Sequence, residues 1–377
     1  MIKKLFIILI SIGLLVGCTS KKETINIDLP EKVKAMWFSY VDFNAEFKNI
    51  ADGDVESKVE EIINNCDELG INTIFVHAVA FTDAMYESKI YPRSSHSDSI
   101  DYLKIFVEKA HEKGMHIEAW INPMRSYTSE QMKDISDEYL IKQWVNENNS
   151  AIRLFENRYY LNPSMQEAQK LILDVVDELC TNYDIDGIHM DDYFYPAKVI
   201  EDFDYEQFIQ SGEIDSSTFR KNSVNQLVTK IHELVNSKNK IFGISPSGNI
   251  EYSRDVIFGD VDAWVQEGSI DYLVPQIYWG YTNKTKPYLE TLEAWQELAG
   301  KNNVDLIVGL AGYKIGVASN DSDQEEWNSD ESILKKQAVD AIDRNTRGIA
   351  IFSYHSLFTQ CNELTEINKE NLKISTK

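Results

Sequence analysis

Length, composition and charge limit what this chain can be. It has 377 residues, 43% of them hydrophobic and 26% charged, with a formal net charge of −24. This composition is typical of a globular protein, and the length allows one large barrel or two ordinary domains. The negative charge argues against nucleic acid as a partner and against a basic membrane-binding surface.

The first 18 residues predict export. Lys3 and Lys4 precede an apolar stretch over residues 5–16, which is shorter than the roughly 20 residues needed to span a bilayer and is typical of a secretory signal. Leu15-Val16-Gly17-Cys18 resembles a bacterial lipobox, which implies cleavage before Cys18 and lipidation of its thiol. An ordinary signal peptide with a chance cysteine is the alternative. Residues 19–30 read as a polar tether, so we expect a membrane-anchored lipoprotein of the cell envelope that faces outside the cytoplasm.

The remaining cysteines predict no covalent framework. Cys66, Cys180 and Cys361 are odd in number and widely spaced, which fits neither a disulfide scaffold nor a zinc site. Cys66 and Cys180 fall at apolar positions of helical patterns, so buried free thiols are expected.

One unit recurs along the chain: an apolar strand, a polar loop and an amphipathic helix. The expected strands are residues 33–40, 71–78, 116–122, 187–193, 241–247, 272–279, 306–313 and 348–355. Helical apolar spacing covers residues 55–69, 102–111, 166–180, 222–235 and 289–298. Alternating strands and helices favour a parallel sheet, and eight units predict an α/β fold closed as a (β/α)8 TIM barrel.

An open doubly wound sheet is the competing architecture. It usually has a glycine-rich turn after its first strand, whereas this chain reads Tyr40-Val41-Asp42-Phe43-Asn44. We therefore predict a single catalytic domain over residues 31–377. The long segments after strands three and four, residues 124–163 and 196–217, are expected to form walls of the active site.

Strand alternation predicts which side chains face the barrel interior. In the third strand Ile117, Ala119 and Ile121 suit the helix side, so the residues between them point inward. The same argument turns His189 and Asp191 inward. The predicted mouth is rich in amide, imidazole and aromatic groups, which suit sugar hydroxyls and sugar ring faces; it contains His77, Asn122, Gln276, Tyr278, Tyr313 and Tyr354.

The sharpest chemical signal is the adjacent acids Asp191 and Asp192 at the end of strand four, followed directly by aromatic residues. Glycosidic cleavage needs two carboxyl groups. Asp191 is the first choice for nucleophile or charge stabiliser. Asp192 is a partner acid, a hydrogen-bonding anchor or a loop cap. The identity of the second catalytic acid remains open. Asp83 is the further catalytic candidate, and Glu251 and Glu118 are alternatives.

Other chemistries find less support. His77, His189 and His355 lack the spacing of metal-binding motifs, and the acidic run over residues 320–331 lacks a calcium-loop pattern. Ser245-Pro246-Ser247-Gly248 is not a nucleophile turn. We therefore expect no metal and no cofactor.

Several segments resemble the glycosyl hydrolase-like 10 family of bacterial envelope lipoproteins. They run in order along the chain: Asn72-Thr73-Ile74-Phe75, Asp83-Ala84-Met85-Tyr86, residues 118–125, residues 186–196, Phe242-Gly243-Ile244-Ser245-Pro246, residues 270–279 and Gly312-Tyr313-Lys314. The resemblance implies a glycosidase barrel similar to the α-galactosidase type, in which the nucleophile ends strand four, and so implies this role for Asp191. At least one member resembles a hydrolase of peptidoglycan glycan strands, which suggests the substrate.

Two segments depart from the family pattern. His77-Ala78-Val79-Ala80 stands where an Arg is usual, and Ser247-Gly248-Asn249-Ile250 is not a close match. The rim positions and the matching segments together predict a substrate-binding set of His77, Asn122, Arg125, His189, Tyr193, Gln276, Tyr278, Trp279, Tyr313 and Lys314. A non-catalytic barrel lipoprotein that binds glycan is the alternative, and a second carboxyl group near Asp191 would argue against it.

Overall fold

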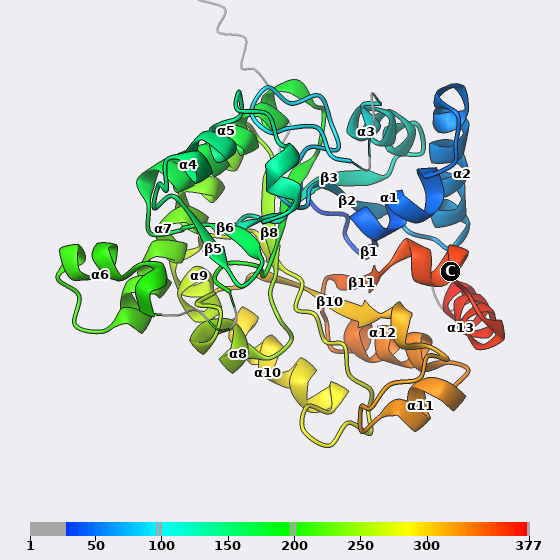
Figure 1. The fold of residues 1–377 in the computed structure, drawn as a ribbon. Helices are drawn as coiled ribbons and strands as arrows, with labels where there is room; N and C mark the ends of the chain where they lie inside the picture. The colour runs from blue at the N-terminus through cyan, green and yellow to red at the C-terminus, as the bar shows by residue number, and fades with distance from the viewer. Residues whose placement is uncertain (1–27, 96, 98–99, 197, 199–200, 375–377) are drawn as a thin grey trace, which may run out of the picture.

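The computed structural model describes residues 28–95, 97, 100–196, 198 and 201–374, so the predicted signal segment, Cys18 and most of the predicted tether lie outside the described residues. Eight parallel strands close a barrel in the order β1-β11-β10-β9-β8-β7-β3-β2 (Figure 1). The predicted (β/α)8 barrel is confirmed. Its strands are β1 Val33–Phe38, β2 Thr73–Val79, β3 His116–Ile121, β7 Gly187–Asp191, β8 Ile241–Ser245, β9 Tyr272–Leu273, β10 Asp305–Ala311 and β11 Gly348–Phe352.

Helices surround the barrel, and all five predicted helical segments are present. The long ones are α2 Val55–Glu68, α3 Tyr102–Glu112, α5 Gln166–Asn182, α7 Ser216–Ser237, α10 Tyr288–Gly300, α12 Ile333–Asp343 and α13 Glu363–Ile374. Shorter helices lie in the connections: α1 Tyr40–Phe47, α4 Leu140–Asn146, α6 Tyr205–Ser211, α8 Ile250–Asp255, α9 Val261–Glu267 and α11 Gln324–Ser329. Their apolar faces pack on the outer face of the sheet, which forms the main core.

Seven of the eight barrel strands end earlier than alternation predicts, because the chain leaves the hydrogen-bonded ladder to build the mouth, whereas β2 ends one residue later than predicted, at Val79. The clearest case is β9, expected over residues 272–279 but present only as Tyr272–Leu273. Pro275 has no N–H to donate, so the regular ladder cannot continue through it, and Gln276 makes only isolated bridges to its neighbours. The released residues form the rim of the mouth.

The segment after β3 holds a small sheet that the sequence reading missed. Strands β4 Arg125–Thr128, β5 Ile152–Phe155 and β6 Arg158–Leu161 pair antiparallel in the order β4-β6-β5. Each has four residues, too few for a clear alternation. The sheet stands beside the mouth, as expected for a wall, and carries Arg125 into the site.

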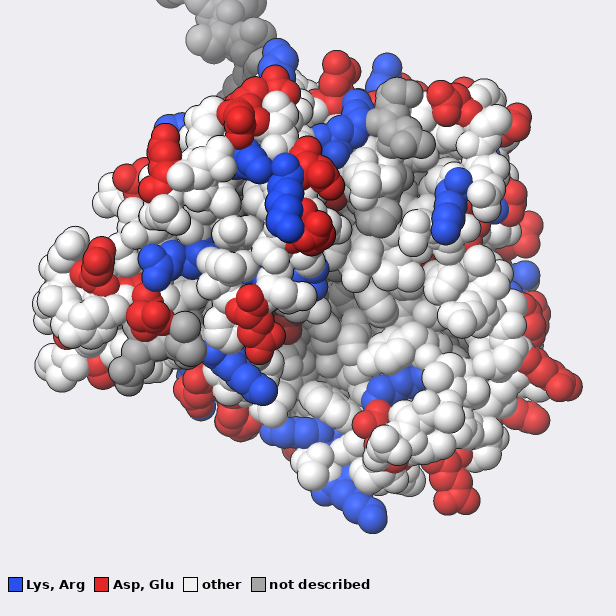
Figure 2. Space-filling view, viewed as in Figure 1, with Lys and Arg blue, Asp and Glu red and all other residues white. Residues whose placement is uncertain are grey.

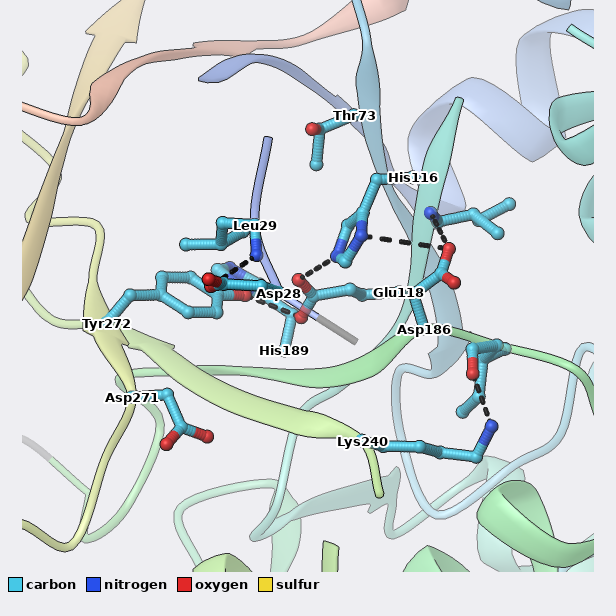
Figure 3. Close-up of polar contacts among 12 residues, drawn as sticks. Asp28, Leu29, Thr73, His116, Glu118, Asp186, His189, Lys240, Asp271 and Tyr272 are labelled. Atoms are coloured by element: carbon cyan, nitrogen blue, oxygen red, sulfur yellow. Dashed lines mark hydrogen bonds and ion pairs between the residues drawn. The ribbon is translucent and has the colours of Figure 1, made fainter. Parts of the chain in front are cut away.

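A polar chain crosses the barrel interior below the mouth (Figure 3). The hydroxyl of Tyr272 donates to Oε2 of Glu118 at 2.6 Å, and Oε1 of Glu118 lies 2.8 Å from Nε2 of His116. The ring of Tyr272 fits because residue 243 is glycine: a Cβ there would lie 2.0 Å from a ring atom. The interior is therefore a packed core with paired polar groups.

Residues 28–30 depart from the tether expectation. The side chain of Leu29 is 6% exposed and packs in the inner barrel cluster with Val33 and Ile241. The guanidinium of Arg347 donates to the carbonyl oxygens of Leu29 and Pro30 at 2.9 and 3.0 Å. The packed domain thus begins before residue 31, because one apolar side chain closes the amino end of the barrel.

Cys66 and Cys180 are buried free thiols, as predicted, and Cys361 is a partly exposed free thiol. Within the described ranges, no helix has the length and apolarity needed to cross a membrane.

Candidate active site

A cavity of about 320 Å³ opens at the carboxyl ends of the barrel strands. Figure 2 shows this face hollowed near its centre, over the ring of strands in Figure 1. The wall combines aromatic, amide and hydroxyl groups with one acid and one guanidinium; its residues are Trp37, Ser39, Tyr40, Val41, His77, Trp120, Asn122, Arg125, Asp191, Tyr193, Ser245, Gln276, Tyr278, Tyr313 and Phe352. This is the position where barrel enzymes place their chemistry.

Asp191 is the last residue of β7, and its carboxyl group lines the cavity at 3% exposure. Ile188 and Met190 face the helices, as the alternation predicted. The indole Nε1–H of Trp120 donates to Oδ2 of Asp191 at 3.2 Å, and the backbone N–H of Tyr193 donates to Oδ1 at 3.4 Å. Two donors on separate oxygens fix the orientation of this carboxyl group.

Asp192 is partly exposed beside the cavity and shares a side-chain hydrogen bond with Gln276, which lines it. The guanidinium of Arg125 lies 4.3 Å above the ring of Tyr193, and its charge acts on both carboxyl groups. The site therefore holds two adjacent acids and one fixed cation.

The environment raises the pKa of both carboxyl groups. Burial, and then repulsion from Asp192, raise the pKa of Asp191 well above its usual range, although Arg125 and the two N–H donors act in the opposite direction. Burial raises the pKa of Asp192 to about 6. Both acids therefore resist ionisation, and the neighbouring charge of Asp192 adds to this effect at Asp191.

Asp192 is not itself a wall residue of this cavity, and the other acids considered from the sequence do not line it either. Oδ1 of Asp83 accepts hydrogen bonds from the backbone N–H groups of Ala80 and Phe81 at 3.1 and 2.7 Å, so Asp83 shapes its own loop. Glu251 pairs with Lys286 at 3.0 Å. Glu118 is fully buried deep in the barrel. Asp83 is therefore not assigned as the second acid, because its carboxylate accepts hydrogen bonds within the turn after β2.

Most of the predicted substrate-binding residues meet at the cavity: His77, Asn122, Arg125, Tyr193, Gln276, Tyr278 and Tyr313. Trp279 instead packs against the main core. The Lys314 ammonium pairs with Asp321 at 2.7 Å. Neither residue lines the cavity, because the chain turns away immediately after Tyr278 and Tyr313.

His189 faces inward as predicted but lies under the cavity. Its Nε2 accepts from the indole N–H of Trp37 at 3.1 Å, so Nδ1 carries the proton and faces the hydroxyl of Tyr272 at 3.0 Å. Burial lowers the pKa of His189 to about 3, which keeps the ring neutral. His189 therefore supports Trp37 and is buried away from substrate.

Seven residues of the cavity wall were not in the substrate-binding set predicted from the sequence. They are Trp37, Ser39, Tyr40, Val41, Trp120, Ser245 and Phe352. Alternation already placed Trp120 on the inward face of its strand, and the same pattern could have added Trp37 to the set. Tyr354 was expected at the mouth but is buried, with its hydroxyl accepting from Asn65 at 2.8 Å, and Phe352 occupies the rim instead.

Among the described residues, no group of three or more His, Cys, Asp or Glu side chains could hold a metal ion. The cavity wall itself offers one carboxyl group, one guanidinium and several hydrogen-bonding side chains.

Gln276 is expected to contribute to binding more than to folding. Its Nε2 donates to the carbonyl oxygen of Ser245 at 3.0 Å and its amide contacts Asp192, so it presents fixed polar groups to the cavity. Gln276→Ala should weaken ligand binding about ten- to a hundred-fold, measured by calorimetric titration, and leave the melting temperature nearly unchanged. Gln337→Ala is the control, because buried Gln337 holds the carbonyl of Trp279 and should lower stability without weakening binding. The reverse pattern would make Gln276 a structural residue.

Comparison with known proteins agrees with this geometry. The solved glycoside hydrolase domain of PgaB (BpsB) from Bordetella bronchiseptica has a TM-score of 0.58 and 10% identity, covering 92% of this chain and 99% of that domain. The α-L-fucosidase isoenzyme 2 of Paenibacillus thiaminolyticus also has a TM-score of 0.58, at 14% identity over 90% of this chain, which spans about half (49%) of that protein. At such identities the likeness shows the fold alone, a (β/α)8 barrel.

The sequence comparisons identify the family. The profile of the Glycosyl hydrolase-like 10 family matches residues 32–329, and this chain belongs to that family. It is 26% identical over 368 residues to Glycosyl hydrolase YngK of Bacillus subtilis, covering 88% of this chain and 70% of the relative. It is 28% identical over 307 residues to Glycosyl hydrolase DigH of Escherichia coli K12, covering 73% and 70%. The enzyme class is that of a glycosidase.

Proposed function

We propose that this chain hydrolyses glycosidic bonds in a bacterial envelope polysaccharide, namely the glycan strands of peptidoglycan, with Asp191 as the carboxyl group that acts at the anomeric carbon. The observation that carries the proposal is the coupled pair Asp191 and Asp192 at the end of β7, with a raised pKa for each acid. A purely structural acid pair would be stabilised in its charged form by salt bridges, whereas here burial opposes ionisation.

The roles follow from position. Asp191 lies at the carboxyl end of the fourth barrel strand, where its carboxylate can attack or stabilise an oxocarbenium-like centre. Asp192, hydrogen-bonded to Gln276 at the rim, is the second carboxyl group beside the cavity and orients the substrate. Trp120 and Tyr193 hold Asp191 in place, so the group is oriented before substrate arrives.

The substrate is suggested by three features. The family resemblance points to envelope glycan. The wall offers exposed aromatic faces at Tyr193 (46% exposed) and Tyr313 (40% exposed), which suit sugar rings. Arg125 offers a cation for an acidic or acetamido substituent.

The direct test is hydrolysis of purified glycan strands. We expect the purified protein to shorten peptidoglycan strands whose peptides have been removed, with mass spectrometry showing products that gain one water for each bond broken. An Asp191→Asn preparation treated in the same way is the control. Intact strands after prolonged incubation with the wild-type enzyme would contradict the proposed substrate.

The cellular location is also a proposal. A lipid on Cys18 would hold the protein at a membrane, with the short segment to Leu29 leading to the amino end of the barrel. The cavity lies at the opposite end, so it would face away from the anchor.

The anchor can be tested by one substitution. Cys18→Ala removes the thiol that would carry the lipid, so the protein should remain uncleaved by lipoprotein processing or appear in the soluble fraction. Membrane fractionation and intact mass check this, with Cys361→Ala as the matched control because that thiol lies in the folded domain. Unchanged mass and unchanged fractionation of Cys18→Ala would refute the lipobox interpretation.

A further inference from the structure

A second hollow lies beside the catalytic cavity. Its volume is about 510 Å³, and it lies between the turn after β10, Gly312–Lys314, and the turn after β11, His355–Thr359. Both turns follow the carboxyl ends of their strands, so the hollow is on the same face as the catalytic cavity. The two spaces share one wall residue, Tyr313. The two spaces therefore adjoin at Tyr313.

The wall of the flanking hollow has no charged side chain. It consists of Gly312, Tyr313, Ile315, Val317, Ser356, Thr359, Gln360, Cys361, Asn362 and Thr365. Three other surface hollows of the described chain each have charged side chains in their walls; these include Glu251 and Lys286, Asp330 and Lys336, and Glu167 and Lys230. In a chain with 26% charged residues, a wall of hydroxyl, amide and apolar groups suits an uncharged polar ligand.

Two of the cations near the flanking hollow are already paired. Lys314 binds Asp321 at 2.7 Å, and Lys369 binds Glu366 at 2.8 Å. Each pair reduces the attraction of its cation for an anionic ligand. The pairing therefore favours a neutral occupant over an anionic one.

The wall is held in a defined shape. Nδ2 of Asn362 donates to the carbonyl oxygen of Ile315 at 2.9 Å, which ties the two turns together. Residue 316 is glycine with φ of +67°, and a Cβ there would lie 2.5 Å from the amide nitrogen of Asn362. The close approach of Asn362 thus depends on this glycine. The hollow is a formed feature that exists before a ligand arrives.

We propose that the flanking hollow is a second sugar-binding subsite, which takes a neutral sugar residue of the same glycan chain whose bond is cleaved in the central cavity. Tyr313 forms the wall between the two subsites, and the exposed amide of Gln360 provides hydrogen bonds to hydroxyl groups. At about 320 Å³, the central cavity is at the small end of ligand pockets and takes only a short part of a polysaccharide. This inference rests on the proposed function.

Blocking the flanking hollow tests the inference. Gln360→Trp places a large ring in the wall of the flanking hollow, and Gln360 has no part in the catalytic cavity. Gln166→Trp is the matched control, since Gln166 is also an exposed glutamine in the wall of a hollow, beside α5 on the outside of the barrel. The probes are peptide-free peptidoglycan oligosaccharides of increasing length, from two sugar units upward. Melting temperatures show whether each variant is folded.

For the wild type we expect kcat/KM to rise with chain length until both subsites are filled. Gln360→Trp should lose about ten-fold or more on the longest probes and keep the wild-type rate on the shortest probe that is cleaved; Gln166→Trp should match the wild type throughout. Equal rates for Gln360→Trp and wild type on long probes, or an equal loss at every length, would overturn the subsite alone. If the wild type cleaves no probe, the proposed function fails, and this inference fails with it.

Discussion

Replacement of Asp191 by Asn is expected to reduce kcat/KM by at least about a thousand-fold, the size of loss typical for a group that acts on the reacting atoms. Asn keeps the shape of the side chain and removes the charge that would stabilise or attack the anomeric centre. Its Oδ1 can still accept the indole N–H of Trp120, so the cavity should keep its form. The check is the rate of glycan-strand hydrolysis together with calorimetric binding, which should remain measurable.

The control for this substitution lies at the other end of the same strand. Asp186 precedes β7, and its Oδ2 accepts from the backbone N–H of Ile117 at 2.8 Å and lies 3.1 Å from Nε2 of His111. Asp186→Asn should lower the melting temperature and change kcat/KM only a few-fold. If a well-folded Asp191→Asn enzyme works at nearly the wild-type rate, Asp191 is not the catalytic carboxyl group, even though the fold and the family stand.

Replacement of Asp192 by Asn should impair activity and stabilise the fold. Burial raises the pKa of Asp192 to about 6, whereas an unfolded Asp titrates near 4. Between these values the folded protein binds more protons than the unfolded chain, so the contribution of Asp192 to stability falls as pH rises and stays low above about pH 6. Asn does not ionise. The variant should therefore gain about 1–3 kcal/mol at pH 7.5, and this gain should disappear near pH 4.

Denaturant unfolding at several pH values measures this effect. Glu251→Gln is the control, because the pKa of Glu251 is shifted in the opposite direction to that of Asp192. Lys286 lowers the pKa of Glu251, so loss of that charge should give no gain in stability at pH 7.5. The activity of Asp192→Asn should fall less than that of Asp191→Asn if Asp192 mainly orients the substrate. An Asp192→Asn variant with no stability gain at pH 7.5 would show that Asp192 is well solvated and that its pKa is not raised.

The sequence was most informative where side chains repeat with a regular period. Eight apolar strands and the helices between them could be read in order, and alternation within the strands turned Asp191, Gln276 and Tyr278 toward the mouth, where the structure has them. Periodicity reports the direction of a side chain, since the geometry of a strand fixes it. It reports depth poorly: His189 and Asp191 share a face, yet only Asp191 reaches the cavity.

Loops were where local reasoning failed. Asp83 seemed able to reach the mouth, but its carboxylate serves two N–H groups of its own turn. Lys314 follows Tyr313 directly, yet it turns to Asp321. The fate of a polar loop residue depends on which partner lies nearest in three dimensions, and no pattern along the chain contains that information.

The sequence by itself determined the barrel, the face that holds the candidate site and the acid at the end of strand four, because hydrophobic period and strand order are properties of the chain. Only the tertiary structure decided that Asp83, Glu118 and Glu251 do not line the cavity with Asp191, that burial raises the pKa of Asp191, and that Arg125 from a small added sheet stands over Tyr193. Those outcomes arise from distances between residues that lie far apart in sequence, and from how completely the folded chain excludes water around them.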